Sequence, residues 1–337
     1  MATTFNRRSL LPLLMGSALL SPARADEAKF RLRCSLDTSA THGRTIYIGE
    51  YLKELEQASG GRIETELFHS GQLFRDRDIA KAMRQGAVEM AAPGTWELTG
   101  FVPDTDVVWM PLLFGRTPAE ARKLTDGPIG DLVNAEVEKA LGVKVIGAWF
   151  DLGLTTFATL KKPIETAADL NGLKIRVSGG TGQFLHVKYY GGVPDLTAWP
   201  DVPLALSQGM FDGLVASTES MASAKLWETG VKYVFVTNES MGMYIPMVTD
   251  RFWAKLPPDL QKLMLDLWAK NLPRYREAMA QRQAEARKTL EAHGVKFFDP
   301  TKQQIDAIRA GMMAQSDAWA QQMKISAPML ALLKQQQ

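Results

Sequence analysis

Side chains that commonly bind metals or carry out catalysis are few and widely spaced in this sequence. The four histidines are His42, His69, His186 and His293, and none has another histidine or a cysteine within four residues. Because zinc sites need such ligands at short spacings, the sequence predicts no metal site. The G-x-S-x-G turn of serine hydrolases and the phosphate-binding loop G-x-x-x-x-G-K-S/T are also missing from the sequence. The sequence therefore favours binding over catalysis and predicts no cofactor.

Two weaker motifs could also carry chemistry. The Gly-Gly-Thr-Gly segment at 179–182 follows a predicted strand and opens a predicted helix, but it lacks the third glycine of a dinucleotide-binding turn. We expect a flexible turn there, whose backbone N–H groups could face an anion. Carboxylates two residues apart, such as Glu64 with Glu66 and Asp76 with Asp78, are more typical of a solvated face than of a catalytic pair.

Residues 1–25 have the three parts of a secretory signal peptide. An arginine pair at 7–8 precedes an apolar stretch over residues 10–20, and the small residues of Ala23-Arg24-Ala25 suit a signal peptidase. The apolar stretch is too short to cross a bilayer core of about 30 Å. We expect export to a bacterial periplasm, by the general secretory (Sec) or the twin-arginine route, and removal of the signal.

The charge of the chain gives no reason to expect nucleic-acid binding. The net charge is +2, and residues 1–25 contribute three arginines and no acid, so the mature chain carries about one negative charge. Binding to phosphates needs clustered lysine and arginine side chains. The length of 337 residues is sufficient for about two domains of roughly 150 residues.

Apolar periodicity predicts alternating strands and helices over most of the mature chain. Strands are expected over residues 29–36, 62–68, 87–92, 143–150, 155–160, 173–177, 213–216, 231–237, 241–248 and 295–298. Helices are expected over residues 42–57, 76–85, 119–141, 183–190, 202–208, 257–268, 273–293, 303–323 and 328–334, with an interruption near Pro128 and a break or kink near Pro273. This order predicts the α/β class, with two lobes of mostly parallel sheet and a ligand cleft that closes by hinge motion.

Five segments carry motifs in an order that resembles one known family. The most specific runs from Lys162-Pro163-Ile164 through Ala168-Asp169-Leu170-Asn171-Gly172-Leu173-Lys174-Ile175-Arg176-Val177. The others lie at residues 66–73, 82–90, 110–114 and 205–213. This ordered set resembles the DctP family, the periplasmic solute-binding proteins of TRAP transporters, over essentially the whole mature chain.

The resemblance implies a fold of the periplasmic binding protein type, with two α/β lobes around a cleft and a long helix that spans both. We expect lobe I over residues 26–150 plus about 240–275, and lobe II over residues 151–239 plus about 276–337. The family implies a receptor that binds a small organic acid and delivers it to membrane TRAP permease subunits. We expect the processed protein to be a monomer that is not inserted in the membrane.

The resemblance places Arg176 where relatives have the arginine that holds the ligand carboxylate, to which a guanidinium can donate two parallel hydrogen bonds. Many relatives have a second arginine in the stretch that here contains Thr156 and Phe157, and often an asparagine near Ala216. This sequence has no cation in the first stretch and apolar residues in the second. Because unpaired buried charge is costly, we expect a monocarboxylate with an apolar or aromatic body.

Three more residues complete the predicted site. Trp199 aligns roughly with a pocket aromatic of relatives, and Gln72 lies in the turn after the second strand. Asp201 could accept a hydrogen bond from a ligand hydroxyl or amine, or could cap the following helix. The predicted ligand-binding residues are thus Arg176, Trp199, Gln72, Thr156, Phe157, Asp201 and Ala216.

Two alternative functions stay open at this point. The same fold could pass its ligand signal to a sensor instead of a permease. A secreted enzyme acting on a carboxylate could use His186 or Asp201 as acid or base and Arg176 to position the substrate. The sequence also leaves open whether a metal ion bridges ligand and protein.

Overall fold

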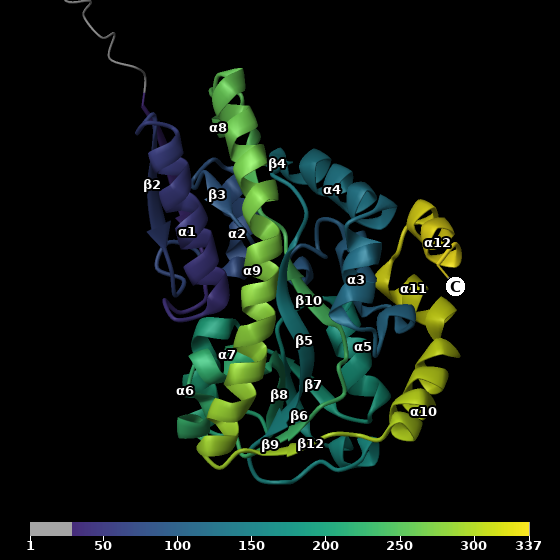
Figure 1. The fold of residues 1–337 in the computed structure, drawn as a ribbon. Helices are drawn as coiled ribbons and strands as arrows, with labels where there is room; N and C mark the ends of the chain where they lie inside the picture. Colours follow the sequence, from purple (N-terminus) through teal and green to yellow (C-terminus); the bar gives the residue numbers. More distant parts are fainter. Residues whose placement is uncertain (1–28, 337) are drawn as a thin grey trace, which may run out of the picture.

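The computed structural model describes residues 29–336, so the predicted signal peptide lies outside the described residues. The described chain forms two β-sheets with helices around them, and one long helix runs along both sheets (Figure 1). Between residues 29 and 336, no helix combines the length and the apolar character needed to pass through a lipid bilayer.

The first sheet has five strands in the order β2-β1-β3-β11-β4. They are β1 (Phe30–Ser35), β2 (Ile63–Phe68), β3 (Met90–Ala91), β4 (Val143–Val145) and β11 (Met247–Thr249). The helices beside it are α1 (Gly43–Ala58), α2 (Asp76–Arg84), α3 (Pro118–Thr125), α4 (Pro128–Leu141) and α8 (Asp250–Trp253). The interruption predicted near Pro128 is confirmed, because α3 ends shortly before this proline and α4 begins at it.

The second sheet has seven strands in the order β12-β9-β5-β8-β6-β7, and β10 pairs with β5 as well. They are β5 (Phe150–Thr159), β6 (Lys174–Val177), β7 (Val193–Leu196), β8 (Gly213–Ser217), β9 (Tyr233–Phe235), β10 (Met241–Tyr244) and β12 (Lys296–Phe298). Its neighbouring helices include α5 (Thr181–Tyr189), α6 (Val202–Ser207) and α7 (Thr218–Ser223). β7 has no counterpart among the predicted strands.

Two predicted strands are wrong because each divides between the two sheets. Residues 143–150 form β4 in the first sheet and then the start of β5, and residues 241–248 form β10 and then most of β11. Apart from Lys144, neither segment contains a charged residue, so periodicity shows no break. Gly147 marks one division with a φ of 149°, and Pro246 marks the other. Both sheets are therefore mixed, because β5 and β11 run antiparallel to their neighbours.

Of the break or kink predicted at Pro273, the break is wrong. One 35-residue helix, α9 (Pro258–Ala292), contains Pro273 in its interior. A proline there removes a backbone hydrogen bond and crowds the preceding turn. Trp268, Leu272 and Tyr275 are buried on either side of it, and α9 packs on α1, β5 and α7. The packing holds the helix continuous through the proline, as the green ribbon in Figure 1 shows.

Short single-turn helices fill segments for which periodicity predicts little. They are η1 (Thr95–Glu97), η2 (Pro103–Trp109), η3 (Pro111–Leu113), η4 (Ala167–Leu170), η5 (Trp199–Asp201) and η6 (Leu226–Thr229). The chain ends in α10 (Lys302–Met313), α11 (Ser316–Met323) and α12 (Ala327–Lys334). α12 packs on α4 and α11 on α5, so the C-terminal helices connect the surroundings of both sheets.

Candidate ligand-binding site

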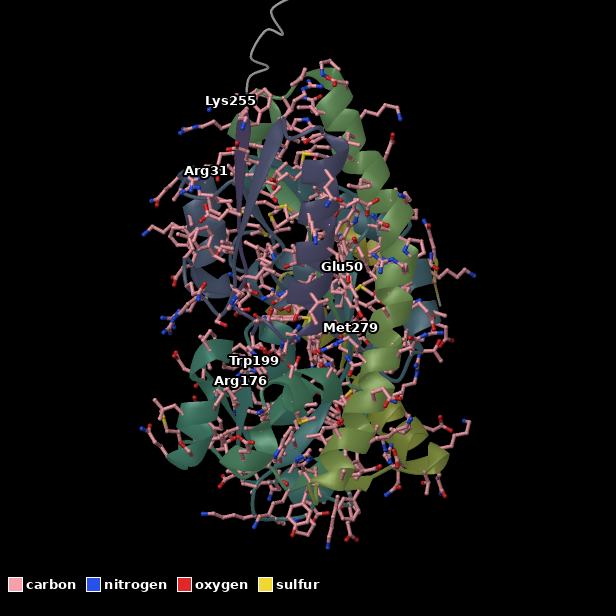
Figure 2. All side chains as sticks on the ribbon, turned by 60° about the vertical axis from the view of Figure 1, so that its left-hand side comes forward. Arg31, Glu50, Arg176, Trp199, Lys255 and Met279 are labelled. Carbon is pink, nitrogen blue, oxygen red and sulfur yellow. The ribbon has the colours of Figure 1, made fainter. Side chains whose placement is uncertain are left out.

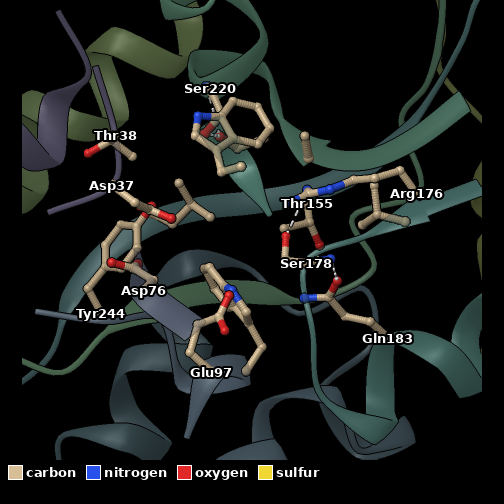
Figure 3. Close-up of a pocket in the computed structure, with 16 residues that line it drawn as sticks. Asp37, Thr38, Asp76, Glu97, Thr155, Arg176, Ser178, Gln183, Ser220 and Tyr244 are labelled. Carbon is tan, nitrogen blue, oxygen red and sulfur yellow. Dashed lines mark hydrogen bonds between the residues drawn. The ribbon is translucent and has the colours of Figure 1, made fainter. Parts of the chain in front are cut away.

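A small cavity lies between the two sheets, where β1, β6 and β8 reach their carboxyl ends. That is where open α/β sheets place ligands. The cavity has a volume of about 40 Å³. Its lining consists of Asp37, Thr38, Asp76, Trp96, Glu97, Leu152, Thr155, Arg176, Ser178, Gln183, Trp199, Val215, Ala216, Ser217, Ser220 and Tyr244. In Figure 3, Arg176, Ser178 and Gln183 lie on one side of the cavity, across from Asp37, Asp76 and Tyr244.

Arg176 is a buried cation on β6 with no carboxylate partner. Its Nε donates to the Thr197 carbonyl at 2.8 Å and its Nη1 to the Ser178 hydroxyl at 2.9 Å. Its side chain is 1% exposed, and burial lowers its pKa to about 10. No described Asp or Glu lies within ion-pair distance of the guanidinium. Arg176 is therefore held by neutral acceptors and forms no ion pair with the described residues.

Two other predicted residues lie in the same cavity. The Trp199 ring centre is 5.3 Å from the guanidinium carbon of Arg176, a distance suited to a cation–π contact. Figure 2 shows the two side chains together, below the part of the molecule that contains α1. Ala216 lines the cavity from β8. The structure thus brings Arg176, Trp199 and Ala216 together.

Thr156 and Phe157 do not line this cavity. Successive side chains of a strand point to opposite faces, and it is Thr155 that lines the cavity from β5. The Thr156 hydroxyl donates instead to the Phe235 carbonyl of the neighbouring strand. Phe157 is fully buried, 5.2 Å from the ring centre of Tyr190. The prediction selected the right strand and missed its register by one residue.

Gln72 and Asp201 also lie outside the cavity. Gln72 is exposed in the turn after β2. Asp201 accepts a hydrogen bond from Arg75 at 2.5 Å, and both side chains are solvated, 45% and 39% exposed. A Cβ on Gly71 would stand 3.4 Å from Pro200, so the turn and η5 are in close contact. These residues form a contact between the two halves of the molecule, at its surface.

A second buried arginine near the cavity is one that the sequence reasoning missed. Arg44 is 0% exposed on α1 and donates from Nη1 to Asp76 at 2.6 Å and to the Ala92 carbonyl at 3.0 Å. It also donates to Asp37 and to the Thr38 hydroxyl. Burial raises the pKa of Asp76 to about 7. The position of Asp37 directly after a predicted strand was the available signal, because ligand-site residues follow strands at that edge.

Glu97 is a third acid of the cavity and another residue that the sequence reasoning missed. It lies on η1, in a segment with no predicted element, next to Trp96. Burial, followed by the nearby charges of Asp76 and Asp37, raises its pKa to about 8. No described cation lies within ion-pair distance of its carboxylate.

The glycine-rich turn at 179–182 faces an anion that belongs to the protein itself. The N–H of Gly182 donates to Asp106 at 3.0 Å, and a Cβ on Gly180 would stand 2.5 Å from the same carboxylate. The missing side chains thus allow η2 to approach α5. The turn supports the cavity wall, since Ser178 and Gln183 flank it.

His186 has no access to a ligand in the cavity. Its Nδ1 is 2.7 Å from Glu239 and its Nε2 2.8 Å from the Trp109 carbonyl, and the side chain is 1% exposed. Both ring nitrogens are therefore occupied in the core. Within residues 29–336, no three His, Cys, Asp or Glu side chains form a group that could hold a metal ion.

Comparisons with known proteins show which family the chain resembles. The family model described as bacterial extracellular solute-binding protein, family 7 (DctP), matches residues 37–322. The C4-dicarboxylate-binding periplasmic protein DctP of Rhodobacter capsulatus is 28% identical over 263 residues, which are 75% of this chain and 76% of that protein.

Two solved structures share the fold. A TRAP periplasmic solute binding protein from Desulfovibrio salexigens, with bound orotic acid, has a TM-score of 0.83 at 23% identity and covers 91% of this chain and 97% of its own. Another, from Bradyrhizobium sp. btai1 with bound galacturonate, has a TM-score of 0.81 at 26% identity, covering 90% of this chain and 98% of its own.

Proposed function

This chain belongs to the DctP family of bacterial extracellular solute-binding proteins, which are receptors and not enzymes, and on that premise we propose that it binds a small monocarboxylate. The observation that carries the proposal is Arg176, a buried cation without a carboxylate partner, in a cavity between two lobes. A ligand carboxylate would supply the missing charge. Names of relatives include binding proteins for C4-dicarboxylates, orotic acid and galacturonate, all of which are acids.

A single carboxylate matches the number of cationic side chains in the lining. Arg176 is the one cationic side chain among the described lining residues. Arg44 lies close by, but its donors are taken up by Asp37, Asp76 and neutral oxygens. A second ligand carboxylate would therefore be buried without a partner. Trp96, Leu152 and Trp199 offer an apolar wall for the body of the ligand.

Closure of the lobes and delivery of the ligand are part of the same proposal. In this conformation the cavity has room for only about three water molecules, at roughly 10–15 Å³ each. Entry of an organic acid thus requires the lobes to move apart, and the proposed lobes are residues 26–150 plus about 240–275 and the remainder of the mature chain. We propose a periplasmic location, a monomeric state and delivery to a TRAP-type permease, in line with the periplasmic and TRAP names of the relatives.

A thermal-shift screen tests the proposal. The chain without residues 1–25 is unfolded and refolded to remove bound ligand, then mixed with aliphatic, aromatic, hydroxy-, oxo- and dicarboxylic acids, with and without a divalent metal. A ligand at 1,000 times its Kd stabilises by about 4 kcal/mol, which raises the Tm by several degrees. We expect shifts with monocarboxylates only. A shift confined to dicarboxylates, or none with any acid, would contradict the proposal.

A further inference from the structure

The two ends of the cavity differ in charge. Arg176, Ser178 and Gln183 form one end, and Asp37, Asp76 and Glu97 contribute three carboxyl groups elsewhere in the lining (Figure 3). Arg44 and Arg176 are the two guanidinium groups near these acids, so the fully ionised site carries one excess negative charge. A plain organic anion would increase that excess when the lobes close on it.

The excess charge is concentrated on Glu97. Asp37 and Asp76 each form an ion pair with Arg44, whereas the Glu97 carboxylate has no described cation within ion-pair distance. Its pKa of about 8 has burial as its main cause, and Asp76, Asp37 and Arg176 are the charged groups that influence it most. A cationic group placed beside Glu97 would compensate this charge, and residues 29–336 place none within ion-pair distance.

An aromatic ring lies next to the same acid. Trp96 directly precedes Glu97 and lines the cavity. Its ring centre is 5.8 Å from that of Tyr244, whose ring already has the guanidinium carbon of Arg44 at 4.3 Å from its centre. Gly94 permits this position, since a Cβ there would be 2.3 Å from the Trp96 ring. Rings that line a cavity beside a carboxylate are the surroundings in which proteins bind alkylated ammonium groups.

We propose that the ligand carries a cationic nitrogen as well as its carboxylate, so that Arg176 binds the carboxylate and Glu97, with the ring of Trp96, binds the nitrogen. The inference rests on the proposed function. The second observation besides the acids is Arg176, a charged side chain 1% exposed that lines the cavity and lacks a counter-ion. The ligand class is the zwitterionic amino acids and alkylammonium carboxylates. Their methyl or methylene groups also provide the apolar body that the lining accommodates.

This arrangement gives the ligand a direct part in closing the cleft. Glu97 and Asp37 belong to the segments before β4, whereas Arg176 lies on β6 of the second sheet. A zwitterion between them attracts both sides at once. A simple anion attracts only the side with Arg176 and leaves Glu97 without a cationic partner.

The test uses pairs of ligands with the same shape and different charge. Glycine betaine and 3,3-dimethylbutanoate differ only in nitrogen against carbon, and proline and cyclopentanecarboxylate form a second pair. Binding is measured by titration calorimetry at pH 7.5 with the wild-type protein, with Glu97→Gln and with Arg176→Met. We expect the zwitterion of at least one pair to bind about tenfold or more tightly than its partner. Glu97→Gln should remove this preference, and Arg176→Met should weaken both members.

The outcomes separate this inference from the proposed function. The first outcome is that the carbon analogues bind as tightly as their zwitterionic partners in every pair, and that Arg176→Met weakens this binding. The proposed function as an acid receptor then stands, and the zwitterion inference is overturned. A preference that survives Glu97→Gln would overturn it as well. If no acid binds, with or without nitrogen, the proposed function itself fails. Glu277→Gln, on the exposed surface of α9, is the matched control and should bind like the wild type.

Discussion

Two buried arginines near one cavity show how the same side chain can stabilise a fold or receive a ligand. Arg44 is bonded to two carboxylates, which raise its pKa above the usual range despite its burial. Arg176 is bonded only to a carbonyl and a hydroxyl, and burial lowers its pKa to about 10. Both side chains are almost fully inaccessible, so burial alone does not distinguish them. The difference lies in the partners.

The comparison teaches that an arginine with its charge already matched is part of the scaffold. Removing Arg44 would leave Asp37 and Asp76 buried without a cation, which is strongly destabilising. Removing Arg176 leaves only neutral groups behind, whose lost hydrogen bonds cost less. Loss of Arg44 should therefore mainly lower the free energy of unfolding, whereas loss of Arg176 should mainly lower the affinity for the ligand.

The largest expected effect is on stability, at Arg44. Arg44→Met should lower the free energy of unfolding by about 3–5 kcal/mol, because two carboxylates lose their partner. Urea unfolding followed by circular dichroism measures it. Arg176→Met is the matched comparison and should change stability by less than about 1 kcal/mol. Equal losses in the two variants would contradict the distinction.

The next effect concerns the aromatic partner of Arg176. Trp199→Ala removes the ring 5.3 Å from the guanidinium carbon, so we expect affinity for the carboxylate ligand to fall about tenfold. Trp227→Ala is the control, because Trp227 contacts His293 away from the cavity. Calorimetric Kd values for both variants check this. A Trp199→Ala variant with wild-type affinity would show that the ring does not support the site.

A smaller effect is the pH dependence that Glu97 gives to the ligand-free protein. The pKa of Glu97 is about 8 in the folded protein, against an ordinary value of 4.5. Between these values the folded state holds the proton that the unfolded state has released, so stability falls as pH rises through this window. Glu97→Gln should remove that contribution and raise the Tm relative to the wild type more at pH 8 than at pH 5. Asp76 also titrates here, but it is present in both proteins and its effect cancels to first order.

The smallest effect is expected for the solvated ion pair of Arg75 with Asp201. Exposed pairs contribute about 0–1 kcal/mol, and salt screens them further. Arg75→Ala should therefore change the Tm by only a degree or two and affinity by less than about threefold, with both changes reduced in 0.5 M salt. A large loss of affinity would show that this surface contact controls closure.

Local patterns in the sequence predicted many helices and strands, because the formation of these elements depends on residues that are close in the chain. The first strand–helix–strand unit is an example: β1, α1 and β2 begin and end within about two residues of the predicted bounds. The division of 143–150 and 241–248 between two sheets could not be predicted, because strand pairing decides it and both segments are mostly apolar. Pro273 was misjudged because tertiary burial outweighs the local cost of a proline.

The site was predictable where a motif fixes a position and not where partners come from distant segments. Arg176 was found through its motif, and its cavity position agrees with that expectation. The prediction selected Thr156 instead of its neighbour Thr155, because the register of this strand depends on its pairing with β8. Arg44 and Glu97 were missed since their importance arises from Asp37, Asp76 and the cavity, which only the folded chain brings together.

The most direct test of the central claim is the Kd of Arg176→Met for the acid that the screen identifies. The control is Arg309→Met, because Arg309 is also held only by carbonyls, those of Phe114 and Leu112, and it is not among the residues that line the cavity. We predict a loss of affinity of about 100-fold or more for Arg176→Met, roughly 3 kcal/mol, and an unchanged Kd for Arg309→Met. A Kd for Arg176→Met within about threefold of the wild type would contradict the assignment of Arg176 to the ligand carboxylate.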